Sequence, residues 1–106
     1  MGYPGPLNWT HSKKTVTTAS TEILAADTGH NTKAIIIQNQ GDQAAYIKIG
    51  ADAVASEGIR VDGAASNAAK HVPPLVLSAA NGLLTHEAIN AIVAGDTEVL
   101  TVAVGK

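Results

Sequence analysis

The stretch KAIIIQNQGDQAAYIKIG, residues 33–50, decides the fold class. Its first part carries three consecutive isoleucines and is typical of a buried strand. Its last part alternates between apolar and polar residues, so that one face would carry Ala45, Ile47 and Ile49. The polar residues around Gly41 have the length and the glycine of a hairpin loop. The stretch therefore predicts two strands joined as a β-hairpin that turns at Gly41.

Strand chemistry recurs along the rest of the chain. In GIRVDG, residues 58–63, we expect Ile59 and Val61 to point inward and Arg60 outward. The two prolines that begin PPLVLSA must open the strand or lie on an edge, since proline cannot donate to a central ladder. The remaining predicted strands are TVTTAS (15–20), EILAA (22–26) and TEVLTVAVGK (97–106).

The segment LLTHEAINAIVAG, residues 83–95, fits two patterns. A helical stripe would contain Leu84, Ala88, Ala91 and Ala94; an alternating strand would bury Ile89, Ala91 and Val93. A strand is favoured because the surrounding segments are all β. Seven or eight short strands predict an all-β fold: a single small β-sandwich or jelly roll of antiparallel strands with an extended N-terminal arm.

The first thirteen residues, MGYPGPLNWTHSK, differ from the rest because they are rich in proline and glycine. They also contain the single tryptophan and one of the two tyrosines, although a terminus that touches nothing gains little from aromatic side chains. We expect residues 1–13 to form an extended arm and residues 14–106 to form the β-sandwich domain. The arm would dock on a neighbour through Tyr3, Pro4, Leu7 and Trp9.

Composition bounds the class of protein. With 106 residues and no cysteine, the chain should fold as one domain without disulfides. Aromatic residues make up only 3% and phenylalanine is absent, so Ile, Val, Leu and Ala must fill the core. Small side chains bury little area each, at about 25 cal/mol per Å². We therefore expect modest stability for the isolated chain, with a contribution from a partner or from self-association.

Charge and hydropathy argue against two classes of partner. The net charge is −2 and the seven basic residues are scattered, so the sequence lacks the basic stripe that nucleic-acid binding requires. Neither a signal peptide nor an apolar run of about 20 residues is found, so we expect no membrane partner and synthesis in a cytoplasm.

Motifs for catalysis or metal binding are weak. HEAIN, residues 86–90, begins like the zinc motif HExxH, but Asn90 occupies the position of the second histidine. The four histidines lie in separate segments (His11, His30, His71 and His86). Five aspartates lie in or beside predicted loops (Asp27, Asp42, Asp52, Asp62 and Asp96), where they usually accept backbone hydrogen bonds; their spacing is not that of a calcium loop. The sequence predicts no enzyme, no cofactor and no metal.

The chain resembles a known class of protein over residues 15–104. The order of four stretches is similar to that in small β-sandwich structural proteins of tailed bacteriophages, chiefly capsid decoration (cement) proteins and related head accessories. These stretches are TVTTASTEIL, KAIIIQNQGDQAAYIKIG, EGIRVDG and AINAIVAGDTEVLTVAVG. Two features depart from the pattern: the longer, proline-containing segment 64–84 and the N-terminal arm.

The resemblance implies a function without an active site. Decoration proteins sit on the exterior of an expanded head, often as trimers, and bridge neighbouring subunits. It thus implies the major capsid protein as partner, self-association with a trimer favoured, synthesis in the host cytoplasm and a final location on the capsid exterior. Two alternatives remain: a tail, connector or fibre-associated β-domain, and a carbohydrate-binding module that would use Tyr46 as its aromatic platform.

Overall fold

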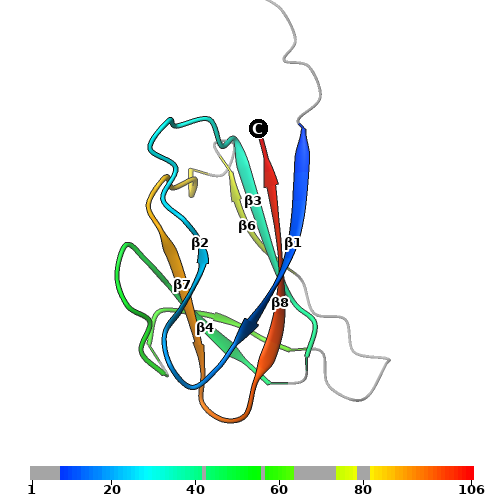
Figure 1. Ribbon diagram of the computed structural model, residues 1–106, viewed down its shortest axis with the longest axis vertical. Coiled ribbons are helices and arrows are strands. Elements are labelled where there is room, and N and C mark those ends of the chain that lie inside the picture. Colours follow the sequence, from blue (N-terminus) through cyan, green and yellow to red (C-terminus); the bar gives the residue numbers. More distant parts are fainter. Residues whose placement is uncertain (1–7, 42, 56, 64–73, 79–81) are drawn as a thin grey trace, which may run out of the picture.

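The described residues form eight strands, which lie in two layers (Figure 1). The computed structural model describes residues 8–41, 43–55, 57–63, 74–78 and 82–106. Within these residues no helix is long and apolar enough to cross a bilayer. The strands are β1 (Trp9–Val16), β2 (Thr21–Leu24), β3 (Ala34–Asn39), β4 (Ala45–Ile49), β5 (Ile59–Val61), β6 (Leu75–Ser78), β7 (Ile89–Val93) and β8 (Glu98–Gly105).

The strands form two antiparallel four-stranded sheets with the topology of a jelly roll. Sheet A has the order β1-β8-β3-β6 and sheet B the order β2-β7-β4-β5. The first strand pairs with the last, the second with the seventh, the third with the sixth and the fourth with the fifth. This is the pattern of one long hairpin rolled into two layers. The predicted fold class, a small all-β sandwich or jelly roll, is confirmed.

The predicted hairpin at Gly41 is wrong. Strand β3 belongs to sheet A and β4 to sheet B, so the residues between them cross from one layer to the other. Both strands bury alternate residues in the same core, Ile35 and Ile37 from one side and Ala45 and Ile47 from the other. The predicted alternation is therefore right and only the pairing is wrong, because a short glycine-containing connection suits a crossover as well as a hairpin.

The predicted boundary between arm and sandwich, between residues 13 and 14, lies too far along the chain, because the first strand begins at Trp9. Residues 9–13 belong to β1, which pairs with β8 over its whole length, from Trp9 opposite Gly105 to Val16 opposite Glu98. The strand was hidden in the sequence because it is polar on both faces for most of its length, as an edge strand can be. The predicted strand 15–20 correspondingly ends at Val16. Residues 1–7 lie outside the described part of the chain.

The core between the sheets is entirely aliphatic, as the composition predicts. Its buried members are Val16, Ile23, Ile35, Ile37, Ala45, Ile47, Val61, Leu77, Ile89, Ala91, Val93, Leu100, Val102 and Val104. Residues 89–93 form a strand with the predicted alternation, so the strand interpretation of segment 83–95 is confirmed.

Two edge strands test the sequence pattern. Val61 is buried and Arg60 exposed, as predicted; Ile59 lies on the inward side, opposite the buried Ile47, as predicted, but it is 39% exposed. Strand β5 has three residues and forms one edge of sheet B, so Ile59 lacks a neighbouring strand on one side. Pro74 lies directly before β6, an edge strand of sheet A, in agreement with the proline argument.

Neighbouring isoleucines of β3 provide a test of the inward and outward assignment. Ile37 is fully buried, whereas Ile36 points to the outer side and is half-buried. Ile37→Ala should lower the free energy of unfolding by about 2–5 kcal/mol, because it leaves a cavity in the core. Ile36→Ala should cost clearly less. Urea denaturation measures both, and equal losses would contradict the assignment.

Candidate functional site

The outer faces of the two sheets differ in chemistry. The outer face of sheet B carries Glu22, Lys48 and Arg60. Arg60 donates from Nε to Asp62 Oδ1 at 2.5 Å, and this hydrogen bond raises the pKa of the arginine; both side chains are exposed. Tyr46, Asn90 and Ile92 lie between these charges, so this face is a mixed surface of charged, polar and apolar residues, of the kind that covers most proteins.

The outer face of sheet A is apolar over half of its length. Two adjacent rows of cross-strand partners form this surface, which we call the apolar rows. They consist of Trp9, Gly105, Ala34 and Ser78, and of His11, Ala103, Ile36 and Val76. Trp9 is 42% and Val76 39% exposed, whereas Ala103 between its neighbours is almost covered. Three of the four central positions are small (Gly105, Ala34 and Ala103), so a partner can approach the backbone of this half of the sheet closely.

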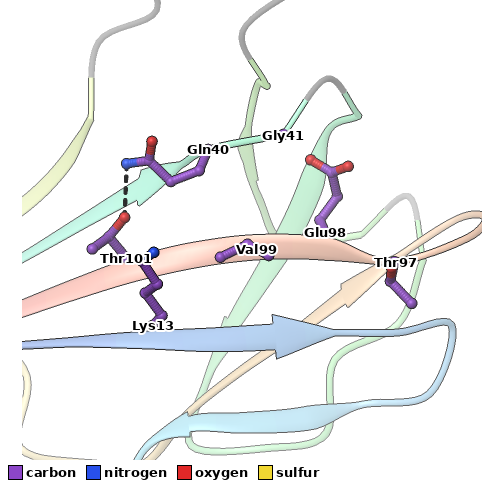
Figure 2. Close-up of a pocket in the computed structure, with 7 residues that line it drawn as sticks. All are labelled: Lys13, Gln40, Gly41, Thr97, Glu98, Val99 and Thr101. Atoms are coloured by element: carbon purple, nitrogen blue, oxygen red, sulfur yellow. Dashed lines mark hydrogen bonds between the residues drawn. The ribbon is translucent and has the colours of Figure 1, made fainter.

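A polar hollow continues the same face beyond the apolar rows. It has a volume of about 540 Å³ and is lined by Lys13, Gln40, Gly41, Thr97, Glu98, Val99 and Thr101 (Figure 2). The Gln40 amide donates from Nε2 to Thr101 Oγ1 at 2.7 Å and so connects the end of β3 with β8. The side chains of Lys13 and Thr101 belong to directly paired positions of β1 and β8.

Glu98 is the unusual residue of this hollow. Alternation along β8 places it on the inner side with Leu100 and Val102, and it is only 4% exposed. Its carboxylate lies beside Gly41, where a Cβ atom would collide with both of its oxygens (Figure 2). Oε2 is buried and has no hydrogen-bond partner among the residues that the structure describes. Buried polar atoms are nearly always paired, so this oxygen requires an explanation.

The neighbouring buried polar residue, Asn39, is by contrast fully engaged. Its amide donates to the backbone oxygens of Gln43 (2.6 Å) and Val61 (3.2 Å), and its Oδ1 accepts from the Gly41 N–H (2.9 Å). These bonds hold the crossover after β3 in place and keep Gly41 against the Glu98 carboxylate. The crossover is therefore built by Asn39, and Glu98 contributes no hydrogen bond to it.

The opposite end of the sandwich holds a second polar cluster. Asp27 accepts a hydrogen bond from the Thr32 N–H at 2.7 Å, and this bond lowers the pKa of the aspartate. The rings of His30 and His86 stack with centroids 4.3 Å apart. The Asp27 N–H donates to the His86 carbonyl at 2.8 Å, which ties the loop after β2 to the segment before β7. The sequence placed these histidines in separate segments and gave no sign of the stack.

The other predicted site residues are dispersed. In the part of the chain that the structure describes, no group of three or more His, Asp or Glu side chains could hold a metal ion. His11 lies in the apolar rows, and Asp62 pairs with Arg60. His71 and Asp42 lie outside the described residues.

Of the four residues predicted to bind a partner, the structure places one. Trp9 begins β1 at the margin of the apolar rows, whereas Tyr3, Pro4 and Leu7 lie outside the described residues. Asn8 and Lys106 exchange two backbone hydrogen bonds, each 2.9 Å long, so Asn8 lies beside the end of β8. Contact of Trp9 with a partner stays a prediction.

Sequence reasoning missed Glu98, although a signal was present. In EVLTVAV the inward positions after it are Leu100, Val102 and Val104, so an acidic residue heads an otherwise apolar face.

Comparisons of the chain with protein families, with curated proteins and with solved structures give no match.

The contact between Gly41 and Glu98 can be tested by a double-mutant cycle. Gly41→Ala should destabilise the protein by about 1 kcal/mol, at the low end of overpacking costs, because its Cβ displaces only the flexible end of the Glu98 side chain. In a Glu98→Ala background the same change should cost much less, because the colliding atoms are gone. Equal costs in both backgrounds, measured by urea denaturation, would show that the two residues do not meet.

Asp27 predicts a defined pH dependence. Because its pKa is lowered in the folded state, the ionised carboxylate stabilises the fold above about pH 4, and this stabilisation is lost as the pH falls through the folded-state pKa. Asp27→Asn should lower the melting temperature at pH 7 and leave it unchanged near pH 2. The exposed Glu22→Gln variant is the control. A melting-temperature difference for Asp27→Asn that is the same at both pH values would contradict this role.

Proposed function

We propose that the chain is a structural protein of a tailed-phage virion, most specifically a capsid decoration protein. In this proposal it binds the exterior of the head, bridges major capsid subunits and catalyses no reaction. The observation that carries the proposal is the exposed apolar half of sheet A, opposite an outer face of sheet B that carries the charged residues Glu22, Lys48 and Arg60. A protein that functions by attachment needs one such face and no reaction centre.

Two further features support the proposal. The four stretches that carry the resemblance to decoration proteins contain β2, β3, β4, β5, β7 and β8 and the end of β1. The jelly roll is also an architecture that viral capsid domains use, although the same architecture occurs in lectins, so the fold alone favours neither.

Attachment through the apolar rows follows from their composition. The small central residues Gly105, Ala34 and Ala103 let a partner approach the backbone closely, and Trp9 at the margin provides an aromatic anchor. Aromatic anchors of this kind commonly dominate interface energies. A partner bound here would also stabilise the small aliphatic core by mass action, which suits a protein that functions only in an assembly. Self-association, with a trimer favoured, belongs to the same proposal.

The alternatives receive different support. A position in the tail, connector or fibre would use the same kind of face and differs in copy number. A carbohydrate-binding role has less support, because Tyr46 is half-buried and lies between its cross-strand partners Arg60 and Ile92. The described part of that face provides no second aromatic ring to complete a sugar platform.

Copy number separates these roles. Quantitative mass spectrometry of purified virions should give a ratio to the major capsid subunit near one, or a simple fraction set by capsid symmetry. Only a few copies per particle would indicate that the protein belongs to the tail or portal. Absence from the particle would overturn the proposal.

Trp9→Ala tests the attachment face directly. The variant should retain its fold, because Trp9 is substantially exposed at the start of an edge strand, but it should lower binding to heads roughly tenfold or more. Tyr46→Ala, an aromatic truncation on the opposite outer face, is the matched control and should bind normally. If Trp9→Ala occupies heads to the same extent as the unaltered protein, Trp9 does not belong to the interface.

A further inference from the structure

An unpaired buried carboxylate is the least expected feature of the molecule. An oxygen removed from water and left without a donor is costly, and buried charges in proteins are normally paired. In the described part of the chain Glu98 Oε2 has no donor, although the fold satisfies the adjacent buried polar side chain of Asn39. A donor that comes from outside the chain would account for this difference.

Lys13, the cation among the described residues that line the hollow, does not fill this role. Lys13 lies on the outer side of β1, opposite Thr101, and its side chain is directed toward Thr101 (Figure 2). Glu98 is directed toward Gly41, on the other side of Val99. The ion pair found among the described residues joins Arg60 and Asp62 on sheet B and does not involve Glu98.

We infer that this hollow binds a basic side chain of a protein partner, which pairs with Glu98. Charge complementarity selects a cationic group, and the volume of about 540 Å³ exceeds what one guanidinium or ammonium group needs. The Gln40 carbonyl and the hydroxyl of Thr97 line the same hollow and can accept further hydrogen bonds. A guanidinium is favoured over an ammonium group, because it is more weakly hydrated and loses less on entering a partly enclosed site.

The position of the hollow indicates that its ligand belongs to a protein. The hollow lies on the same outer face as the apolar rows, and Thr101 and Ala103 occupy successive outward positions of β8. A partner seated on the apolar rows would therefore bring its own surface over the hollow. A basic residue at that edge of the partner would fix its orientation, since charged contacts at interfaces contribute mainly to specificity. The identity of the partner rests on the proposed function, whereas the basic-group site does not.

Solution NMR with a side-chain analogue tests the site without a partner. N-ethylguanidinium chloride is titrated into labelled protein, against sodium chloride at equal ionic strength. The Gly41 amide and the Glu98 carboxyl carbon should shift saturably, with a dissociation constant on the order of millimolar, as expected for one ion pair. Glu98→Gln, which keeps the shape of the side chain, should weaken binding at least about tenfold, and Glu22→Gln should leave it unchanged.

Two results would overturn the inference. One is a set of shifts that stay linear in concentration or survive Glu98→Gln. The other is a set of shifts at residues around the exposed acids, such as Glu22 and Glu57, without shifts at the residues that line the hollow. The melting temperatures of the variants show whether each is folded before it is titrated.

The result of the analogue titration can be distinguished from the result of the virion measurement that tests the proposed function. If the analogue binds at Glu98 but the protein is absent from virions, the site stands and the virion assignment fails. If the protein covers the head but the analogue does not bind and Glu98→Gln occupies heads normally, the assignment stands and the inference fails.

Discussion

The pairing of the first strand with the last is the constraint on which the rest of the structure depends. Strand β8 pairs with β1 on one side and with β3 on the other, and it supplies Leu100, Val102 and Val104 to the core. Without it, sheet A would separate into β1 and the β3–β6 pair. The register set by Trp9 opposite Gly105 also aligns the apolar rows and brings Lys13 next to Thr101 at the hollow.

The sequence predicted elements better than it predicted their neighbours. Alternation identified β4 and β7 because their buried positions are occupied without exception by aliphatic residues. The same pattern does not encode which strand lies alongside, so the connection at Gly41 was taken for a hairpin. Residues 9–13 of strand β1 were not predicted as a strand, because an edge strand does not need an apolar face along its whole length.

The candidate site was less predictable than the fold, for a physical reason. The apolar rows exist only after β1, β8, β3 and β6 are placed in register, and these strands are far apart in the sequence. The unpaired state of Glu98 likewise depends on the Asn39 side chain, which engages the crossover and leaves the acid without a donor. Trp9 could be selected as an anchor from its rarity alone, whereas its place on a sheet could not.

The backbone bonds between Asn8 and Lys106 have a mechanical consequence. Both residues lie at the same end of an antiparallel pair, so a force that pulls the two chain ends apart opens the β1–β8 hydrogen bonds one after another, beginning at this pair. Peeling of this kind needs far less force than shearing all the bonds of two strands at once. The chain is therefore weak toward tension applied at its ends. It is stronger toward load spread across the outer face of sheet A, where all four strands share it.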